Sequence, residues 1–300
     1  MSIEPSTFLR RRFRFRLRTM LLVVAVIAVP LAWIAKERRQ SQHEQQLADE
    51  LRKHGFDEIW LGSRYNLWDY DQNKPQSKWR QLAGQVLGER VMGVFGNKSD
   101  LDDLTAVTEL TKLQRFGLDE TKLSDLTPIA DLTNLHELWI SHSQVNDLAA
   151  LAGLKNLQDL VIFDSSVSDL RPLGELKNLR HLAVSDSPQV RDVTPLAGLH
   201  ELFFLQLDGT NADIAPLASL TSLQSLTLNR TPVSDLSPLA GLANLEDLAL
   251  NETQVTDLTP LAGLKKLINV ELTGTRVSKE QVDALRKALP NCSIKHDPFP

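Results

Sequence analysis

A phrase of about 22 residues, repeated eight times, is the feature that most constrains how this chain of 300 residues can fold. Two neighbouring copies read DLSPLAGLANLEDLALNETQVT at 235–256 and DLTPLAGLKKLINVELTGTRVS at 257–278. Aligned on their aspartates, the copies begin at Asp103, Asp125, Asp147, Asp169, Asp192, Asp213, Asp235 and Asp257. A unit of this length cannot bury its own leucines, so the copies must stack and share a continuous core. The repeat therefore predicts a solenoid over residues 103–278.

The apolar residues of each copy follow a rhythm that matches neither a plain helix nor a plain strand. The phrase L-x-x-L-x-L-x-x-N/T-x-L is typical of leucine-rich repeats, which carry one short strand and a return turn per copy. We expect an α/β solenoid whose parallel strands lie about 4.8 Å apart on the concave side. The residues predicted to point inward are Phe116/Leu118, Leu138/Ile140, Leu160/Ile162, Leu182/Val184, Leu205/Leu207, Leu226/Leu228, Leu248/Leu250 and Val270/Leu272.

Two polar positions recur at the turns. A hydroxyl stands where many such repeats carry asparagine, and we expect it to satisfy buried backbone groups. These hydroxyls belong to Thr121, Ser143, Ser165, Ser187, Thr210, Thr231, Thr253 and Thr275. The following D-L-x-P-L step predicts a short helical or 3₁₀ turn on the convex side. In that step Thr127, Thr194, Ser237 and Thr259 are predicted to be N-caps, with proline at the first helical position.

With its 22-residue period and D-[LIV]-x-P-L step, the sequence resembles the internalin type of bacterial leucine-rich repeat protein over residues 90–278. The resemblance implies a non-enzymatic, protein-binding surface. Three departures are visible. Ser or Thr replaces the usual Asn, Ala149-Ala150 replaces the x-Pro step, and repeats four and five carry a one-residue insertion and deletion. We expect the last two to bend the stack locally.

Both ends of a solenoid need a cap, because a bare end would expose the core. Residues 279–300 predict a C-terminal cap, with a helix over 279–289 and a strand near 291–295. Residues 55–102 predict an N-terminal cap, with an amphipathic helix over 77–88 and a strand over 89–97. Its first part, residues 55–76, is compatible with one or two further strands.

The beginning of the chain predicts a membrane anchor. Residues 1–18 form a basic head, residues 19–35 an apolar run without a charge, and residues 36–54 a polar, helix-prone stalk. Seventeen helical residues span about 25 Å, the lower limit for crossing a bilayer core. A cleaved signal peptide is the alternative, but the run ends in Leu31-Ala32-Trp33-Ile34-Ala35, a poor cleavage site. We therefore favour an uncleaved signal anchor from Thr19 to Ala35.

Charge predicts the orientation of this anchor. Residues 1–39 hold nine basic and two acidic residues, a net charge of +7, and the whole chain has −5, which leaves −12 for the remainder. Six arginines precede the run, so the positive-inside rule favours a cytoplasmic amino end and an exported repeat domain in the periplasm or cell envelope. The acidic remainder would repel phosphate and argues against a nucleic-acid partner.

No recognisable catalytic motif or cofactor-binding motif occurs in the sequence, so we expect neither an enzyme nor a cofactor. The single cysteine, Cys292, cannot form an internal disulfide and is expected to pack as a small hydrophobe. One column carries Glu120, His142, Asp164 and Asp186 in successive repeats. Such side chains could share a cation, but a solvated acidic rim is the preferred interpretation and no metal site is predicted.

Function can be encoded only in the strand residues that point away from the core, since the repetition supplies the scaffold. Four apolar residues fall in these outward columns: Trp139, Val161, Phe163 and Phe204. We expect them to form one apolar strip, bordered by Asp119, Asp159, Asp164, Asp186 and Asp208. Exposed apolar strips with aromatic anchors mark interaction sites, and the acidic border favours a basic protein or peptide. Two alternatives stay open: a structural spacer without a ligand, and a strip covered by residues 55–76.

Overall fold

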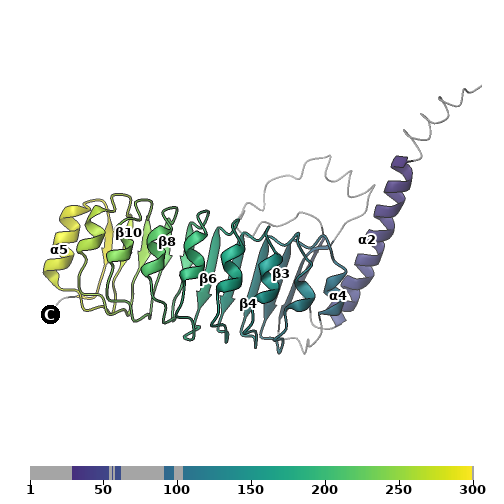
Figure 1. The fold of residues 1–300 in the computed structure, drawn as a ribbon, viewed down its shortest axis with the longest axis horizontal. Coiled ribbons are helices and arrows are strands. Elements are labelled where there is room, and N and C mark those ends of the chain that lie inside the picture. Colours follow the sequence, from purple (N-terminus) through teal and green to yellow (C-terminus); the bar gives the residue numbers. More distant parts are fainter. Residues whose placement is uncertain (1–28, 54–55, 57, 62–90, 98–103, 299–300) are drawn as a thin grey trace, which may run out of the picture. The chain divides into compact units, whose positions relative to one another are not determined.

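The computed structural model describes residues 29–53, 56, 58–61, 91–97 and 104–298 (Figure 1). They fall into two compact units, and among the described residues the smaller unit comprises 29–43 while the larger begins at Glu44. The predicted basic head, the first ten residues of the predicted anchor and the predicted helix over 77–88 lie outside the described residues. Within the described residues, no helix has both the length and the apolar character needed to cross a bilayer.

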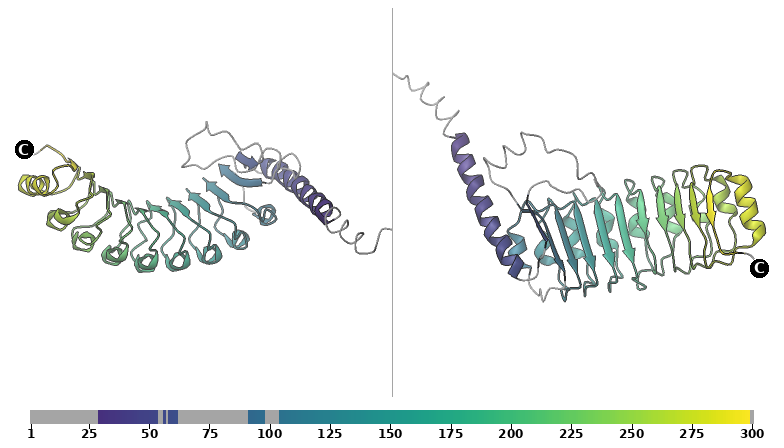
Figure 2. Two further views of the ribbon diagram at one scale, coloured as in Figure 1. Left: turned by 90° about the horizontal axis from the view of Figure 1, so that it is seen from above. Right: turned by 180° about the vertical axis from the view of Figure 1, so that it is seen from behind.

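An 11-stranded sheet runs through the larger unit, with its strands in sequence order. Strand β1 (Glu58–Leu61) pairs antiparallel with β2 (Val91–Asn97), and all later pairings are parallel. The other strands are β3 (Arg115–Asp119), β4 (Glu137–Ser141), β5 (Asp159–Phe163), β6 (His181–Ser185), β7 (Phe204–Gln206), β8 (Ser225–Thr227), β9 (Asp247–Ala249), β10 (Asn269–Glu271) and β11 (Ser293–Lys295). The strands line the inner side of the curved repeat stack, and short helices line the outer side (Figure 2). The predicted leucine-rich repeat solenoid is confirmed.

The core is the row of residues predicted to point inward. Every member of the eight pairs is at most 2% exposed, from Phe116 in β3 to Leu272 after β10. Each pair packs against the equivalent pairs of the neighbouring strands in one continuous cluster. One register therefore holds along the whole stack, because a shift by one residue would turn the leucines outward.

On the convex side each repeat from the second to the eighth forms a 3₁₀ turn. The turns are η2 (Thr127–Ile129), η3 (Ala149–Gly153), η4 (Arg171–Glu175), η5 (Thr194–Gly198), η6 (Ala215–Ser219), η7 (Ser237–Leu239) and η8 (Thr259–Gly263). The prediction that Thr127, Thr194, Ser237 and Thr259 are N-caps is wrong. Each is the first residue of its turn, proline is the second, and the preceding aspartate accepts its backbone N–H, as from Thr127 to Asp125 at 2.8 Å. In η2 the N-cap position itself is Leu126, so Asp125 binds the turn from one residue before the N-cap.

The recurrent hydroxyls satisfy backbone groups as predicted in most repeats. Thr210, Thr231, Thr253 and Thr275 each donate to the carbonyl three residues earlier, at 2.6–2.7 Å. Ser187 instead donates to the carbonyl of Ser185 at 3.1 Å. Thr121 differs, because its hydroxyl has no hydrogen-bond partner among the described residues.

The strands become shorter at β7, next to the one-residue insertion and deletion of repeats four and five. Strands β3 to β6 have five residues, whereas β7 to β10 have three. Just after these short strands, side-chain oxygens of one repeat accept hydrogen bonds from backbone N–H groups of the next repeat. Asp208 Oδ1 accepts the backbone N–H of Asn229 at 2.8 Å, and Asn229 Oδ1 accepts that of Asn251 at 2.9 Å. Asn251 Oδ1 in turn accepts the N–H of Thr273 at 2.9 Å.

Helices close both ends of the larger unit. At the C-terminus α5 (Lys279–Ala288) starts at the N-cap Ser278 and buries Val282 and Leu285, close to the predicted helix over 279–289. At the other end, the first repeat carries the one-turn helix α4 (Thr105–Thr108) in place of a 3₁₀ turn. Helix α2 (Val29–Lys53) covers most of the predicted stalk.

From Glu44 onward α2 is part of the fold. Leu47, Ala48 and Leu51 are buried in the core, and Glu44 Oε2 accepts the backbone N–H of Val91 at 3.1 Å. The prediction of a free stalk up to residue 54 is therefore wrong for residues 44–53, which help to cap the first strands.

Candidate functional site

Three columns of side chains face outward on the concave sheet, and the strand register defines them. The first column begins with Arg115, Glu137 and Asp159. The middle column continues from Phe95 through Gly117 and Trp139 to Val161, and the third includes Asp119, Ser141 and Phe163. The sequence-predicted columns are thus correct in register, with β2 added at the front.

The middle column holds an aromatic pair that sequence reasoning missed. Phe95 and Trp139 meet edge to face, with ring centroids 4.9 Å apart. Gly117 lies between them in the column, and a side chain there would clash with the Phe95 ring. Val161 follows Trp139 on the next strand, and Trp139 and Val161 are both half-buried. The alternation of side chains along a strand could have revealed Phe95: Val94 is a core residue, so its neighbour Phe95 must point to the concave side.

The predicted strip does not extend to Phe204. Phe163 stands in the third column and Phe204 in the first, paired with His181. These columns are four residues apart, or about 13 Å along a strand. The ring of His181 contacts Phe203 at 4.3 Å between centroids and lies 6.1 Å from Phe204. The prediction of one continuous strip is therefore wrong in this part. We use "apolar strip" below for Phe95, Trp139, Val161 and Phe163 only.

Phe163 is flanked by an ionisable pair. The His142 ring lies edge-on to the Phe163 ring at 5.2 Å, and its Nδ1–H donates to Asp119 Oδ1 at 2.8 Å. This hydrogen bond raises the pKa of His142; burial opposes the rise, and the negative charges of Asp119, Asp164 and Glu120 add to it. Positive charge at one end of the strip is therefore stabilised by the acidic border.

Four ionisable residues form a row in the first column, next to the strip. Arg115 Nε donates to Glu137 Oε1 at 3.0 Å, and both side chains are 11% exposed. Asp159 follows on β5, where its Oδ1 contacts Nδ1 of His181. Burial raises the pKa of Glu137, with Arg115 opposing and the nearby Asp159 carboxylate adding to the rise. We call these four residues the charge row.

The acidic rim has a common backbone conformation. Glu120, His142, Asp164 and Asp186 all adopt positive φ angles of 44–48°, which a turn after each strand imposes. They border a hollow of about 590 Å³. Among the described residues no group of three or more ligating side chains is placed to hold a metal ion.

Two further aspartates of the predicted border, in addition to Asp119 and Asp159, have partners within the chain. Asp186 Oδ1 accepts from Arg230 Nη2 at 2.7 Å. Asp208 is 9% exposed, and Gln206 Nε2 donates to it at 3.1 Å in addition to the bonds from Asn229. Asp208 therefore serves mainly to join β7 to β8.

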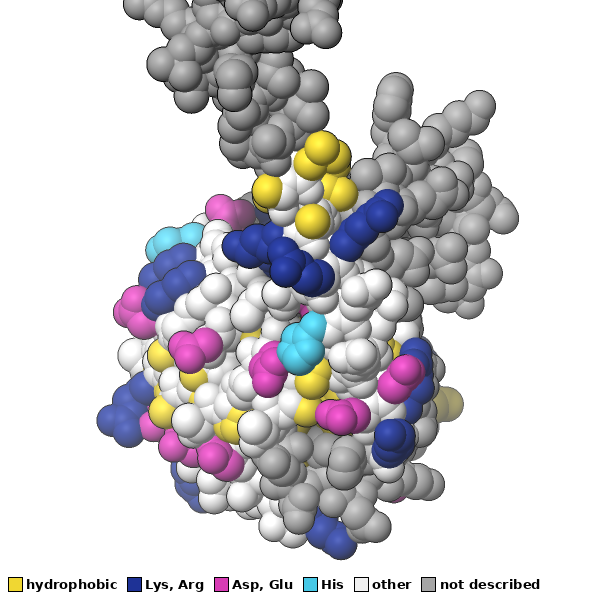
Figure 3. All heavy atoms as spheres, turned by 90° about the vertical axis from the view of Figure 1, so that its right-hand side faces the viewer, with side chains coloured by type: hydrophobic (Ala, Val, Ile, Leu, Met, Phe, Trp, Pro, Cys, Tyr) yellow, Lys and Arg dark blue, Asp and Glu magenta, His cyan; other side chains and the backbone are white. Residues whose placement is uncertain are grey.

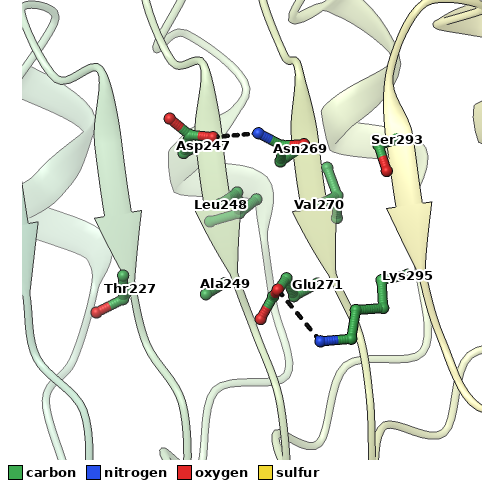
Figure 4. A pocket seen from close by; sticks show the side chains of 9 residues that line it. All are labelled: Thr227, Asp247, Leu248, Ala249, Asn269, Val270, Glu271, Ser293 and Lys295. Carbon is green, nitrogen blue, oxygen red and sulfur yellow. Dashed lines mark hydrogen bonds and ion pairs between the residues drawn. The ribbon is translucent and has the colours of Figure 1, made fainter.

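The far end of the concave face is polar. A pocket of about 270 Å³ has Ala249 in its lining, with Leu248 and Val270 on the neighbouring positions. Asn269 Nδ2 donates to Asp247 at 2.6 Å, and Lys295 lies 3.5 Å from Glu271, as Figure 4 shows. This half of the face lacks the aromatic side chains of the first half.

Comparisons with solved structures find the same fold elsewhere. An internalin, InlF, from Listeria monocytogenes has a TM-score of 0.63 at 23% identity, over 76% of this chain and 72% of that one. Internalin C2 from the same species has a TM-score of 0.58 at 31% identity, over 61% and 80%. A leucine-rich repeat protein of Leptospira interrogans has a TM-score of 0.60 at 25% identity, over 65% and 51%. No protein-family model matches the sequence. A search of curated proteins finds no significant match.

Proposed function

This chain has an internalin-type leucine-rich repeat fold, and we propose that it is a non-enzymatic scaffold whose concave face binds another protein or a peptide. The observation that carries the proposal is the apolar strip. It places three aromatic rings and a valine in the middle and third concave columns, which carry polar residues such as Glu271 and Thr273 in the far repeats. A structural spacer would not need aromatic side chains at these positions.

We further propose that the repeats are carried on a single membrane anchor, with the amino end in the cytoplasm. The sequence supports this through the apolar run Thr19–Ala35 and its arginine-rich head. Leu31 and Trp33, near the start of α2, are 58% and 52% exposed, and Lys36, Arg38 and Arg39 follow them in the sequence. Figure 3 shows hydrophobic side chains next to Lys and Arg side chains on one face of the molecule. Apolar and aromatic side chains ahead of a basic group are what a membrane–water interface favours.

Crosslinking from defined positions tests the binding proposal. A benzoyl-phenylalanine at Ala183, beside Val161 in the middle column, samples the concave face in intact membranes. The same probe at Gly241 samples the convex side, where an added side chain would meet nothing within 4 Å. We expect an adduct of one defined mass from Ala183 and none from Gly241. The adduct should disappear when Trp139→Ala and Phe163→Ala are combined. Identical adducts from both positions, or none from Ala183, would contradict a concave binding site and favour the spacer.

A further inference from the structure

Resting on the proposed binding function, we propose that one corner of the concave face recognises a basic side chain, Arg or Lys, next to an apolar side chain of the partner. The corner consists of Glu137 and Asp159 in the first column and Trp139 and Val161 in the middle column. It would select partners by chemistry, whereas the rest of the strip supplies apolar contact area.

The four residues form a compact square on two adjacent strands. Glu137 pairs with Asp159, and Trp139 with Val161, in the register of β4 and β5. Neighbouring strands are about 4.8 Å apart, and the two columns are about 7 Å apart along the strand. An extended partner segment can therefore place one side chain on the carboxylates and a side chain two residues away on Trp139 and Val161.

Charge at this corner is unbalanced on the negative side. Glu137 and Asp159 are each 8% exposed; Arg115 Nε donates to Oε1 of Glu137, and Nδ1 of His181 contacts Oδ1 of Asp159, so one permanent cation, Arg115, faces two carboxylates. The other oxygen, Oε2, is buried without a hydrogen-bond partner among the described residues. An unsatisfied buried carboxylate oxygen is costly. A cation brought by a partner would offset that cost once the Glu137 carboxylate turns toward it.

The surroundings favour the same ligand. Asp119, Glu120 and Asp164 lie at the third column and the rim of these repeats, so carboxylates also border the other side of the apolar strip. The face of Trp139 offers a second attraction, since aromatic rings bind guanidinium and ammonium groups through their π-systems. A guanidinium can also meet a carboxylate in bidentate geometry.

A purely structural role explains the charge row less well. Buried ion pairs are often no more stabilising than well-packed apolar residues. In the repeats that lack aromatic side chains, the first column reads Ser225, Asp247 and Asn269, of which the last two are exposed. Buried carboxylates in this column therefore occur only where the aromatic strip lies, among the described strands. This shared location suggests that the carboxylates and the aromatic strip contact the same partner.

Peptide selection on the full-length chain in lipid nanodiscs tests the inference without knowledge of the natural partner. The probe is a phage library of random 12-residue peptides, panned against wild type, Glu137→Gln, Asp159→Asn and the matched control Asp247→Asn. Glutamine keeps the shape and the acceptor for Arg115, and thermal unfolding checks that each variant folds. We expect wild type and Asp247→Asn to enrich peptides with Arg or Lys close to an apolar residue. Synthetic peptides of that kind should bind Glu137→Gln or Asp159→Asn roughly tenfold more weakly.

Three results would overturn the inference. Enriched peptides without a basic residue would refute the corner's selectivity but leave concave binding intact. Basic peptides that bind Glu137→Gln and Asp159→Asn as tightly as wild type would place the cation elsewhere. Failure of wild type to enrich any peptide over empty nanodiscs would count against the binding function itself, and the inference would fall with it.

Discussion

The rings of Phe95 and Trp139 touch although their strands, β2 and β4, are not neighbours. The intervening strand contributes Gly117, and the Phe95 ring occupies the space that a side chain would fill there. Because Gly117 has no side chain, the Phe95 ring of the first cap strand packs against the concave face of the repeats. Edge-to-face pairs of this kind contribute about 0.5–1.5 kcal/mol beyond the area they bury.

Gly117→Ala should separate this pair. The added methyl clashes with the Phe95 ring, so we expect the ring to move and unfolding free energy to fall by about 1–3 kcal/mol. Gly241→Ala is the matched control, because nothing lies within 4 Å of the added methyl. Chemical denaturation of both variants measures the difference. Equal stabilities would mean that Phe95 does not lie over Gly117.

Leu226→Ala should be strongly destabilising, whereas Thr227→Ala should be nearly neutral. Leu226 is fully buried between neighbouring repeats, so its truncation should cost about 2–5 kcal/mol. Thr227 faces the concave side, and its hydroxyl has no hydrogen-bond partner among the described residues, so the cost should stay below about 0.5 kcal/mol. Denaturant melts compare the two. Similar losses would show that the strand register is shifted.

Asn251→Ala should weaken the hydrogen bonding between the repeats of β9 and β10. The substitution removes the acceptor for the Thr273 N–H and the donor to Glu271 at 2.8 Å. A part-buried N–H without an acceptor costs about 1–3 kcal/mol. Thr273→Ala serves as the control, because no hydrogen bond of its side chain joins a further strand among the described residues. Hydrogen exchange should become faster at the Thr273 amide in the first variant only, and unchanged exchange would refute the side-chain ladder.

Acid should loosen the convex turns. Hydrogen bonds from the Thr259 hydroxyl and backbone N–H lower the pKa of Asp257 below its ordinary value of 3.8, against a small effect of burial. Equivalent bonds lower the pKa of Asp125, Asp192 and Asp235, and bonds from the side chain and backbone of Arg171 lower the pKa of Asp169. A depressed carboxyl pKa contributes stability that is complete above the unfolded value and is lost as pH falls through the folded value. Unfolding free energy should thus decline below about pH 4. Asp257→Asn keeps an acceptor but cannot titrate, so its decline should be shallower; an identical decline would exclude Asp257 as a contributor.

The repeat, its register and its inward residues could be predicted because each is fixed by local pattern. When the same spacing recurs in every neighbouring repeat, a leucine such as Leu226 can be buried only by pointing into the shared core. Cap assignment failed by contrast, since Thr127 is a good N-cap type directly before a proline. In the structure Thr127 is already the first residue of the turn, the N-cap position is Leu126, and the Asp125 carboxylate reaches the N–H two residues ahead.

The candidate site was predicted less completely because it depends on relations across strands. Phe204 and Phe163 both face outward, but they stand at opposite ends of their strands, so a shared outward direction does not make them neighbours. Phe95 was missed because its strand belongs to a cap without the repeat's spacing. The buried charge row also escaped notice, since Glu137 and Asp159 look like ordinary solvated residues in sequence.

The orientation of the chain in the membrane is the last prediction. Six arginines precede Thr19, whereas three basic residues follow Ala35 closely, so the amino end should stay in the cytoplasm and the repeats should be exported. Alkaline phosphatase fused after Pro300 should be active, and a fluorescent protein that matures only in the cytosol should be dark at the same place. Replacing the six arginines of the head by glutamines is the control, because it removes the charge bias and should lower the phosphatase signal. A bright cytosolic reporter with silent phosphatase in the unmodified chain would reverse the assignment and place the concave face inside the cell.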